Sequence, residues 1–194
     1  MRENRTYGSE GGGGTSLSLP LSEDYDAALE CRGPGNERSM TADPLYRLLA
    51  WLSPAYPIGA FSYSHGVETA VEEGFIKDRA TLVPWLESVL LQGTGVADAA
   101  LFAPAWRAAD AEDWTCFDAV AERAAAWRGT SEMALEARQQ GGSSLSITRT
   151  AWPPPALDAV HEGLSGELAL PVAVALAAAV HGIALDHVLE GYLH

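Results

Sequence analysis

Cysteine and positive charge are both scarce in this chain. Only two of its 194 residues are cysteines, Cys31 and Cys116, and they lie far apart in the sequence. Two distant cysteines indicate neither a disulfide framework nor a cysteine metal site, so we expect a reducing, cytoplasmic compartment. Lys and Arg number 12 against 26 Asp and Glu, which gives a formal net charge of −14. This balance disfavours binding to nucleic acid or to an anionic membrane and favours cationic partners.

The chain also has no convincing leader or membrane span. After Met1 the sequence continues into charged, Gly and Ser residues without an apolar run, so we expect no signal peptide. Residues 168–185 carry no formal charge and have the length of a span. They consist largely of Ala and Val, however, include Pro171, and are bounded by Glu167 and Asp186. We expect them to form a buried helix or helix pair of a water-soluble bundle.

Alternating polar and apolar residues, the pattern of strands, are missing beyond the N-terminal region, and no repeat is evident. We therefore predict an all-α fold with two parts. Residues 1–42, rich in Gly and Ser, are expected to be a disordered tail whose deletion leaves the thermal midpoint nearly unchanged. Residues 43–194 are expected to form a single multi-helix, bundle-like domain, because 47% of the chain is hydrophobic.

Proline, glycine and capping residues predict where the helices begin and end. Pro84 favours Thr81 over Asp78 as the cap of one helix, because proline is tolerated in a first turn and not in an interior one. The alanine-rich segment and a last helix through Tyr192 complete the domain. A first helix is expected from Asp43-Pro44 to Pro54, and a second from Ser62 or Ser64 to Gly74. Two further helices are expected over 96–109 and 114–127. Another is expected from Thr130 or Ser131 to Gln140, and a short one over about 156–164.

One stretch, Ser53–Glu68, is unusually rich in residues that constrain the backbone. Its two prolines force an extended path, and Gly59 and Gly66 permit backbone angles or close approaches that a Cβ forbids. Phe61 and Tyr63 are large enough to anchor the loop in a core. A structural elbow between two helices is one interpretation, and a change of Gly59 to Val is expected to cost about 1–3 kcal/mol if Gly59 adopts a glycine-only angle.

The same stretch carries a family resemblance. It reads Ser-Pro-x-x-Pro-x-Gly-x-Phe-Ser-Tyr-Ser-x-Gly-x-Glu, which resembles the signature of the UreF family of urease accessory proteins at every fixed position. A helix ending in Gly141 and carrying Glu136 and Arg138 fits a second family pattern loosely. The residues that carry the resemblance are Ser53, Pro54, Pro57, Gly59, Phe61, Ser62, Tyr63, Ser64, Gly66, Glu68, Glu136 and Arg138.

The resemblance implies a function that the composition alone does not give. Family members are cytoplasmic, all-helical, dimeric scaffolds that assist nickel insertion into apo-urease. They bridge the accessory protein UreD, also called UreH, and the GTPase UreG. This chain is therefore expected to have no catalytic residues and no cofactor of its own, with nickel handled by the complex. The twelve residues that carry the resemblance are expected to have structural or partner-binding roles.

Two features depart from the family pattern. His65 stands where glutamine is more usual, a change that we expect the fold to tolerate. Family members also continue beyond the position of His194 into a segment implicated in docking partners. Because the apolar stripe of the last helix is still running at Tyr192-Leu193, we expect this chain to be a C-terminally short member with weaker partner recruitment.

Other chemistry is less well supported by the residues. No two of the five histidines have the i, i+4 spacing of a helical metal site, although a nickel site completed by symmetry stays open. Ser62, Ser64 and His65 suggest a small helical serine hydrolase, but adjacent residues seldom form a catalytic triad. A generic helical interaction domain unrelated to nickel is the third alternative. The Glu132–Arg138 cluster is equally compatible with a solvated helix face.

Overall fold

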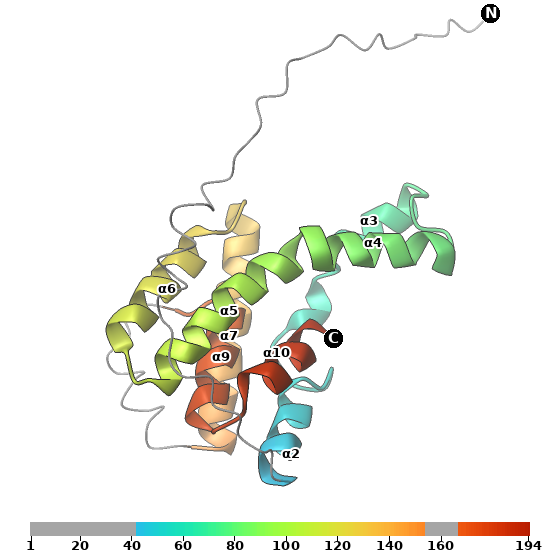
Figure 1. Cartoon of the computed structure of the whole chain (residues 1–194). Coiled ribbons are helices and arrows are strands. Elements are labelled where there is room, and N and C mark those ends of the chain that lie inside the picture. The colour runs from blue at the N-terminus through green and yellow to red at the C-terminus, as the bar shows by residue number, and fades with distance from the viewer. Residues whose placement is uncertain (1–41, 154–166) are drawn as a thin grey trace, which may run out of the picture.

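The computed structural model describes residues 42–153 and 167–194, and every regular element in these ranges is a helix, which confirms the predicted all-α fold (Figure 1). Most are α-helices, and η1 is a short 3-10 helix. The elements are α2 (Ala42–Trp51), η1 (Ala60–Ser62), α3 (Val67–Glu72), α4 (Arg79–Gln92), α5 (Thr94–Asp110), α6 (Trp114–Ala126), α7 (Ser131–Ala151), α9 (Leu170–Val180) and α10 (Leu185–Leu193).

Helix α9 is the centre of the bundle. All residues from Pro171 to Ala179 are buried, as the alanine-rich composition predicted. Helices α5 and α7 pack against α9, and α6 and α10 cover them (Figure 1). Alanine side chains let the neighbouring backbones approach closely, while the valines and Leu176 fill the space between them. Across the described residues, no helix is both long and apolar enough to span a membrane.

Helix α7 continues past the glycine pair Gly141-Gly142 that was expected to end it. The prediction that this helix stops at Gln140 is wrong, because it runs through Gly141 and Gly142 to Ala151. A Cβ on Gly141 would overlap the backbone carbonyl of Leu168, at the entry to α9. Gly141 therefore marks a tight helix contact and not a helix end.

The capping residues confirm some predicted helix starts and correct others. Thr130 caps α7, and its Oγ1 accepts a hydrogen bond from the Met133 amide at 3.2 Å. Helix α4 begins after Asp78 and not after Thr81, because the Asp78 carboxylate accepts from the Thr81 amide while Thr81 Oγ1 accepts from the Asp78 amide. This reciprocal capping box outweighs the interior Pro84.

Two other boundaries differ from the predictions. Helix α2 begins at Ala42, one residue before Asp43. Helix α5 spans Thr94–Asp110, slightly longer than the expected 96–109, and contains Pro104 in its interior. The expected helix at about 156–164, nearly all of the expected tail and Cys31 lie outside the described residues.

Helices α3 and α4 form an arm that projects away from the bundle (Figure 1). Gly74, as predicted, closes α3: its amide and that of Phe75 donate to the carbonyls of Val71 and Ala70. Helix α4 has no buried residue along its whole length. The arm is therefore joined to the core mainly through the junction at Gly93, where α4 passes into α5.

Candidate functional site

The signature stretch forms a tightly turned loop whose shape depends on its glycines. Gly59 and Gly66 have φ angles of 82° and 80°, which confirms that both adopt left-handed backbone conformations. His65 is also left-handed, with φ 50°, so two consecutive residues turn the chain just before α3. The predicted serine cap is wrong: α3 begins after Gly66, with no side-chain cap.

Of the two aromatic residues expected to anchor the loop, Phe61 faces solvent and only Tyr63 is partly buried. Phe61, predicted as a core anchor, is 89% exposed on η1. Tyr63 is half-buried, and its hydroxyl donates to Gln139 Oε1 of α7 at 3.4 Å. The anchor is Tyr56, whose hydroxyl lies 2.8 Å from Thr148 Oγ1 of α7. Burial raises the pKa of Tyr56, while the Thr148 hydrogen bond acts in the opposite direction.

Beside this loop lies an open groove of about 710 Å³ between the loop, α7 and the C-terminal end of α10. We call it the loop groove. Its loop wall includes Ser53, Pro54, Tyr56, Phe61 and Tyr63. The remaining walls come from the junction of α4 and α5, the start of α7, the start of α9 and the last residues of α10.

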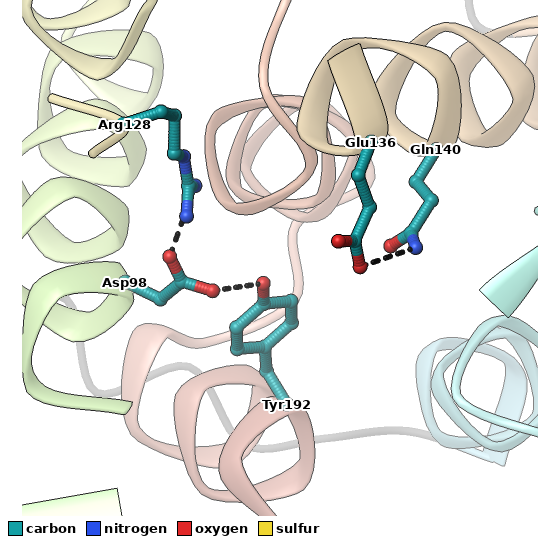
Figure 2. Close-up of polar contacts among 5 residues, drawn as sticks. All are labelled: Asp98, Arg128, Glu136, Gln140 and Tyr192. Carbon is teal, nitrogen blue, oxygen red and sulfur yellow. Dashed lines mark hydrogen bonds and ion pairs between the residues drawn. The ribbon is translucent and has the colours of Figure 1, made fainter. Parts of the chain in front are cut away.

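A polar stripe of α7 lines or borders the loop groove. Its members Glu136, Gln140, Ser144 and Thr148 recur every fourth residue and so share one face of the helix. Gln140 is buried and donates from Nε2 to Glu136 Oε1 at 3.1 Å (Figure 2). Glu136 therefore enters the groove beside the loop.

Arg138 does not share this position. It is two residues from Glu136, hence on another side of α7, and its Nε lies 3.9 Å from Glu167 Oε2. Both side chains are solvent-exposed at this distance, so the pair contributes little to stability.

A second polar cluster fixes α10 at the opposite side of the groove. Asp98 of α5 accepts from Arg128 Nη2 at 3.0 Å and from the Tyr192 hydroxyl at 2.8 Å (Figure 2). The Asp98 and Arg128 side chains are largely shielded from solvent. Burial of its hydroxyl, followed by the negative charge of Asp98, raises the pKa of Tyr192 well above its ordinary value. The cluster therefore holds a neutral tyrosine against an ion pair.

The structure brings together only part of the predicted residue set. Ser53, Pro54, Phe61, Tyr63 and Glu136 line the loop groove. The Ser62 side chain is not among those that the structure describes. The others that do not line it are Pro57, Gly59, Ser64, Gly66, Glu68 and Arg138.

Sequence reasoning missed Gln140, Ser144 and Thr148, although their four-residue spacing from Glu136 was a usable signal. It also missed the Asp98 cluster. No sequence pattern links Asp98, Arg128 and Tyr192, because they come from separate elements of the chain.

The geometry gives little support for metal or hydrolase chemistry. Within residues 42–153 and 167–194, no three His, Cys, Asp or Glu side chains gather as a metal site. His65 is exposed, and no hydrogen bond links it to a carboxylate of a described residue. What the arrangement offers is a rigid loop, a groove with mixed lining and an exposed aromatic ring, which suits recognition of another protein.

Comparison with known proteins adds the family context. The family model described as UreF matches residues 76–194. Urease accessory protein UreF of Bradyrhizobium diazoefficiens is 43% identical over 160 residues, covering 82% of this chain and 66% of the relative. The protein of that name from Granulibacter bethesdensis is 45% identical, covering 80% and 66%, and that from Methylorubrum populi is 49% identical, covering 75% and 65%.

These matches reach beyond the residues of the family model. A match that covers 82% of 194 residues necessarily includes Ser53–Glu68, so the signature loop lies inside the shared region. The chain spans about two thirds of the length of these relatives, 66% for the first two. No solved structure matches the chain. The family model and the relatives agree on one assignment, and the chain belongs to the UreF family.

Proposed function

We propose that this chain is a urease accessory protein that assists nickel insertion into apo-urease as a scaffold or chaperone, without catalysis of its own. The observation that carries the proposal is the similarity to relatives that bear the name urease accessory protein UreF, over 75% to 82% of this chain. Nickel is the cargo of the complex in this proposal, and the chain needs no cofactor.

The partners follow from the same proposal. The chain works in the cytoplasm as a homodimer, bridging a UreD-type (UreH-type) accessory protein and a UreG-type GTPase while the complex acts on apo-urease. Its net charge of −14 favours partners with basic contact surfaces.

The signature loop supplies a contact surface for one of these partners. Hydrogen bonds of Tyr56 to Thr148 and of Tyr63 to Gln139 tie the loop to α7, so less conformational entropy is lost when a partner binds. Phe61 stands out from this loop as an exposed aromatic ring, and aromatic side chains dominate binding hot spots. We assign the partner contact to Phe61 and its neighbours Pro57 and Ser64, with Glu136 inside the groove.

Urease activation in cells tests the proposal. The chain is expressed with urease and the other accessory proteins in a host from which the UreF gene has been removed, and urease activity is measured with nickel present. We expect activity to return with this chain and to fall at least about tenfold for Phe61→Ala, a loss of about 1.4 kcal/mol of binding.

Tyr46→Ala is the matched control, because Tyr46 is also an exposed aromatic residue but lies on α2, outside the loop. We expect this variant to retain activity. If the unaltered chain restores no activity, the proposed function is wrong and a helical interaction domain unrelated to nickel is favoured. Equal activity of the two variants would instead remove the loop from the partner contact.

A further inference from the structure

The loop groove contains one carboxylate that no described cation neutralises. Two carboxylates line it among the described residues, Asp98 and Glu136. Asp98 accepts hydrogen bonds from Arg128 and Tyr192, so its charge is balanced within the protein. Among the described residues, Glu136 accepts only from the neutral side-chain amide of Gln140 and forms no ion pair. Glu136 therefore brings an unbalanced negative charge into the groove.

The Glu136 carboxylate is also held in place. Gln140 lies one turn further along α7, is buried, and donates from Nε2 to Glu136 Oε1 at 3.1 Å (Figure 2). This bond occupies one carboxylate oxygen and leaves Oε2 as an acceptor for another donor. Glu136 is half-buried. A carboxylate that is partly withdrawn from water gains more from an approaching cation than a fully solvated one does.

Apolar side chains line the same groove around Glu136. Met133 lies one turn before Glu136 on α7 and is exposed, and Phe61 and Leu90 are exposed on other walls. The groove volume of about 710 Å³ lies within the range that holds a small ligand or a few side chains. The groove therefore suits a chain segment in which a basic side chain has apolar neighbours.

The charges of the molecule favour the same occupant. With a formal net charge of −14, the protein attracts a basic segment and repels an acidic one. Lysine and arginine pack their apolar stems along apolar surface while the charged head reaches an acceptor. A wholly apolar segment would cover Glu136 without pairing it, and burying an unpaired charge is costly. The groove therefore discriminates against uncharged segments.

We propose that the loop groove binds a segment of a partner protein in which a lysine or arginine lies among apolar residues, and that Glu136 pairs with this basic side chain. The assignment depends on the proposed function only for the source of the segment, a partner protein of the urease-activating complex. The chemistry of the site comes from the groove itself.

Two small probes that differ only in charge test the site. They are Nα-acetyl-leucyl-arginine amide and its citrulline counterpart, which has the shape of arginine but is neutral. NMR titration of the full chain gives the Kd of each probe, with the Gln140 side-chain amide reporting contact beside Glu136. We expect the arginine probe to bind at least about tenfold more tightly, and Glu136→Gln to abolish this preference. Glu122→Gln is the control, because Glu122 is exposed on α6 and does not line the groove.

A salt series gives a second measurement that needs no substitution. Raising the salt concentration from about 0.05 M to about 0.5 M should reduce the preference for the arginine probe several-fold in the unaltered chain, because salt screens the ion pair. Equal affinity of the two probes for the unaltered chain would overturn the proposal. A preference that survives in folded Glu136→Gln, or that salt leaves unchanged, would overturn it as well.

Binding of the full chain to each accessory protein tests the source of the segment. Glu136→Lys is expected to weaken binding of the UreD-type or the UreG-type protein at least about tenfold, and Glu122→Lys to weaken neither. Unchanged binding of both partners by Glu136→Lys would overturn the assignment of the groove to a partner segment.

The urease assay separates this site from the proposed function. A chain that activates urease but binds both probes equally has the proposed function without the cation-binding groove. A chain that prefers the arginine probe through Glu136 but does not activate urease has the groove without the proposed function.

Discussion

Gly141 and Gly142 are neighbours in α7 with different surroundings. A Cβ at Gly141 would overlap backbone atoms at the start of α9, whereas a Cβ at Gly142 would meet nothing within 4 Å. We expect Gly141→Ala to lower the free energy of unfolding by about 1–3 kcal/mol, because helix and backbone must move apart. Gly142→Ala is the control and should leave stability unchanged or raise it by up to about 1 kcal/mol. Urea unfolding measures both, and equal values would contradict the close α7–α9 contact.

The raised pKa of Tyr192 predicts that the protein loses stability at alkaline pH. Its pKa is raised in the folded state, so its contribution is complete below the ordinary tyrosine value of 10.0 and is lost as pH rises through the folded value. Above pH 10.0 the free energy of unfolding should therefore fall with pH, and Tyr192→Phe should make this fall shallower. Urea unfolding at a series of alkaline pH values measures the slopes. Identical slopes in both proteins would show that Tyr192 ionises equally in the folded and unfolded states.

Substitutions at Gly59 measure the cost of the left-handed backbone angle in the signature loop. Nothing lies within 4 Å of a Cβ at this position, but φ is +82°. Gly59→Val is therefore expected to cost about 1–3 kcal/mol of unfolding free energy through its backbone angle alone. Gly59→Asn should cost less, because asparagine tolerates the left-handed region. If both variants unfold like the unaltered protein, the loop is not held in this conformation.

At the level of elements, α4 depends on its capping box because no residue of it is buried. Asp78→Ala removes the carboxylate that accepts from the Thr81 amide, so amide hydrogen exchange in the first turn of α4 should accelerate several-fold. Exchange in α9, which is buried, should not change. Acceleration throughout the bundle would mean that the arm and the core unfold together.

The same cap has a pH dependence of known sign. Hydrogen bonds from the Thr81 amide and hydroxyl lower the pKa of Asp78 below its ordinary value of 3.8. The stabilisation is therefore complete above that ordinary value and is lost as pH falls through the lower, folded one. After correction for the intrinsic pH dependence of exchange, α4 should lose protection in this acidic window, and the Asp78→Ala variant should show no such loss.

For the whole molecule, the net negative charge opposes self-association, whereas apolar contacts favour it. Two copies that each carry a formal charge of −14 repel one another, so a homodimer of this chain has to offset that repulsion with apolar contacts. Raising the salt concentration from about 0.05 M to about 0.5 M should therefore tighten the self-association by screening the repulsion. A partner held by basic residues would instead bind more weakly in the same series. A dimer that weakens steeply with salt would contradict an interface held mainly by apolar contacts.

Local patterns in the sequence were enough to predict the all-α fold, the burial of the alanine-rich helix and the family, while the left-handed angles of Gly59 and Gly66 were one of two alternatives. These features follow from local chemistry: periodic apolar residues specify helices, and a run of small uncharged residues can only be stabilised in a core. The sequence could not show that α7 continues through Gly141, because only the adjacent start of α9 distinguishes a packing glycine from a terminating one.

Which residues form the site depends on long-range packing. Whether Phe61 faces the core or solvent depends on the direction of a turn fixed by left-handed residues, and Tyr56 became the anchor because α7 presents Thr148 to it. Asp98, Arg128 and Tyr192 meet only because α5, α10 and the segment after α6 converge. Such contacts join residues distant in sequence, so no local pattern encodes them, and they arise from how the helices pack around α9.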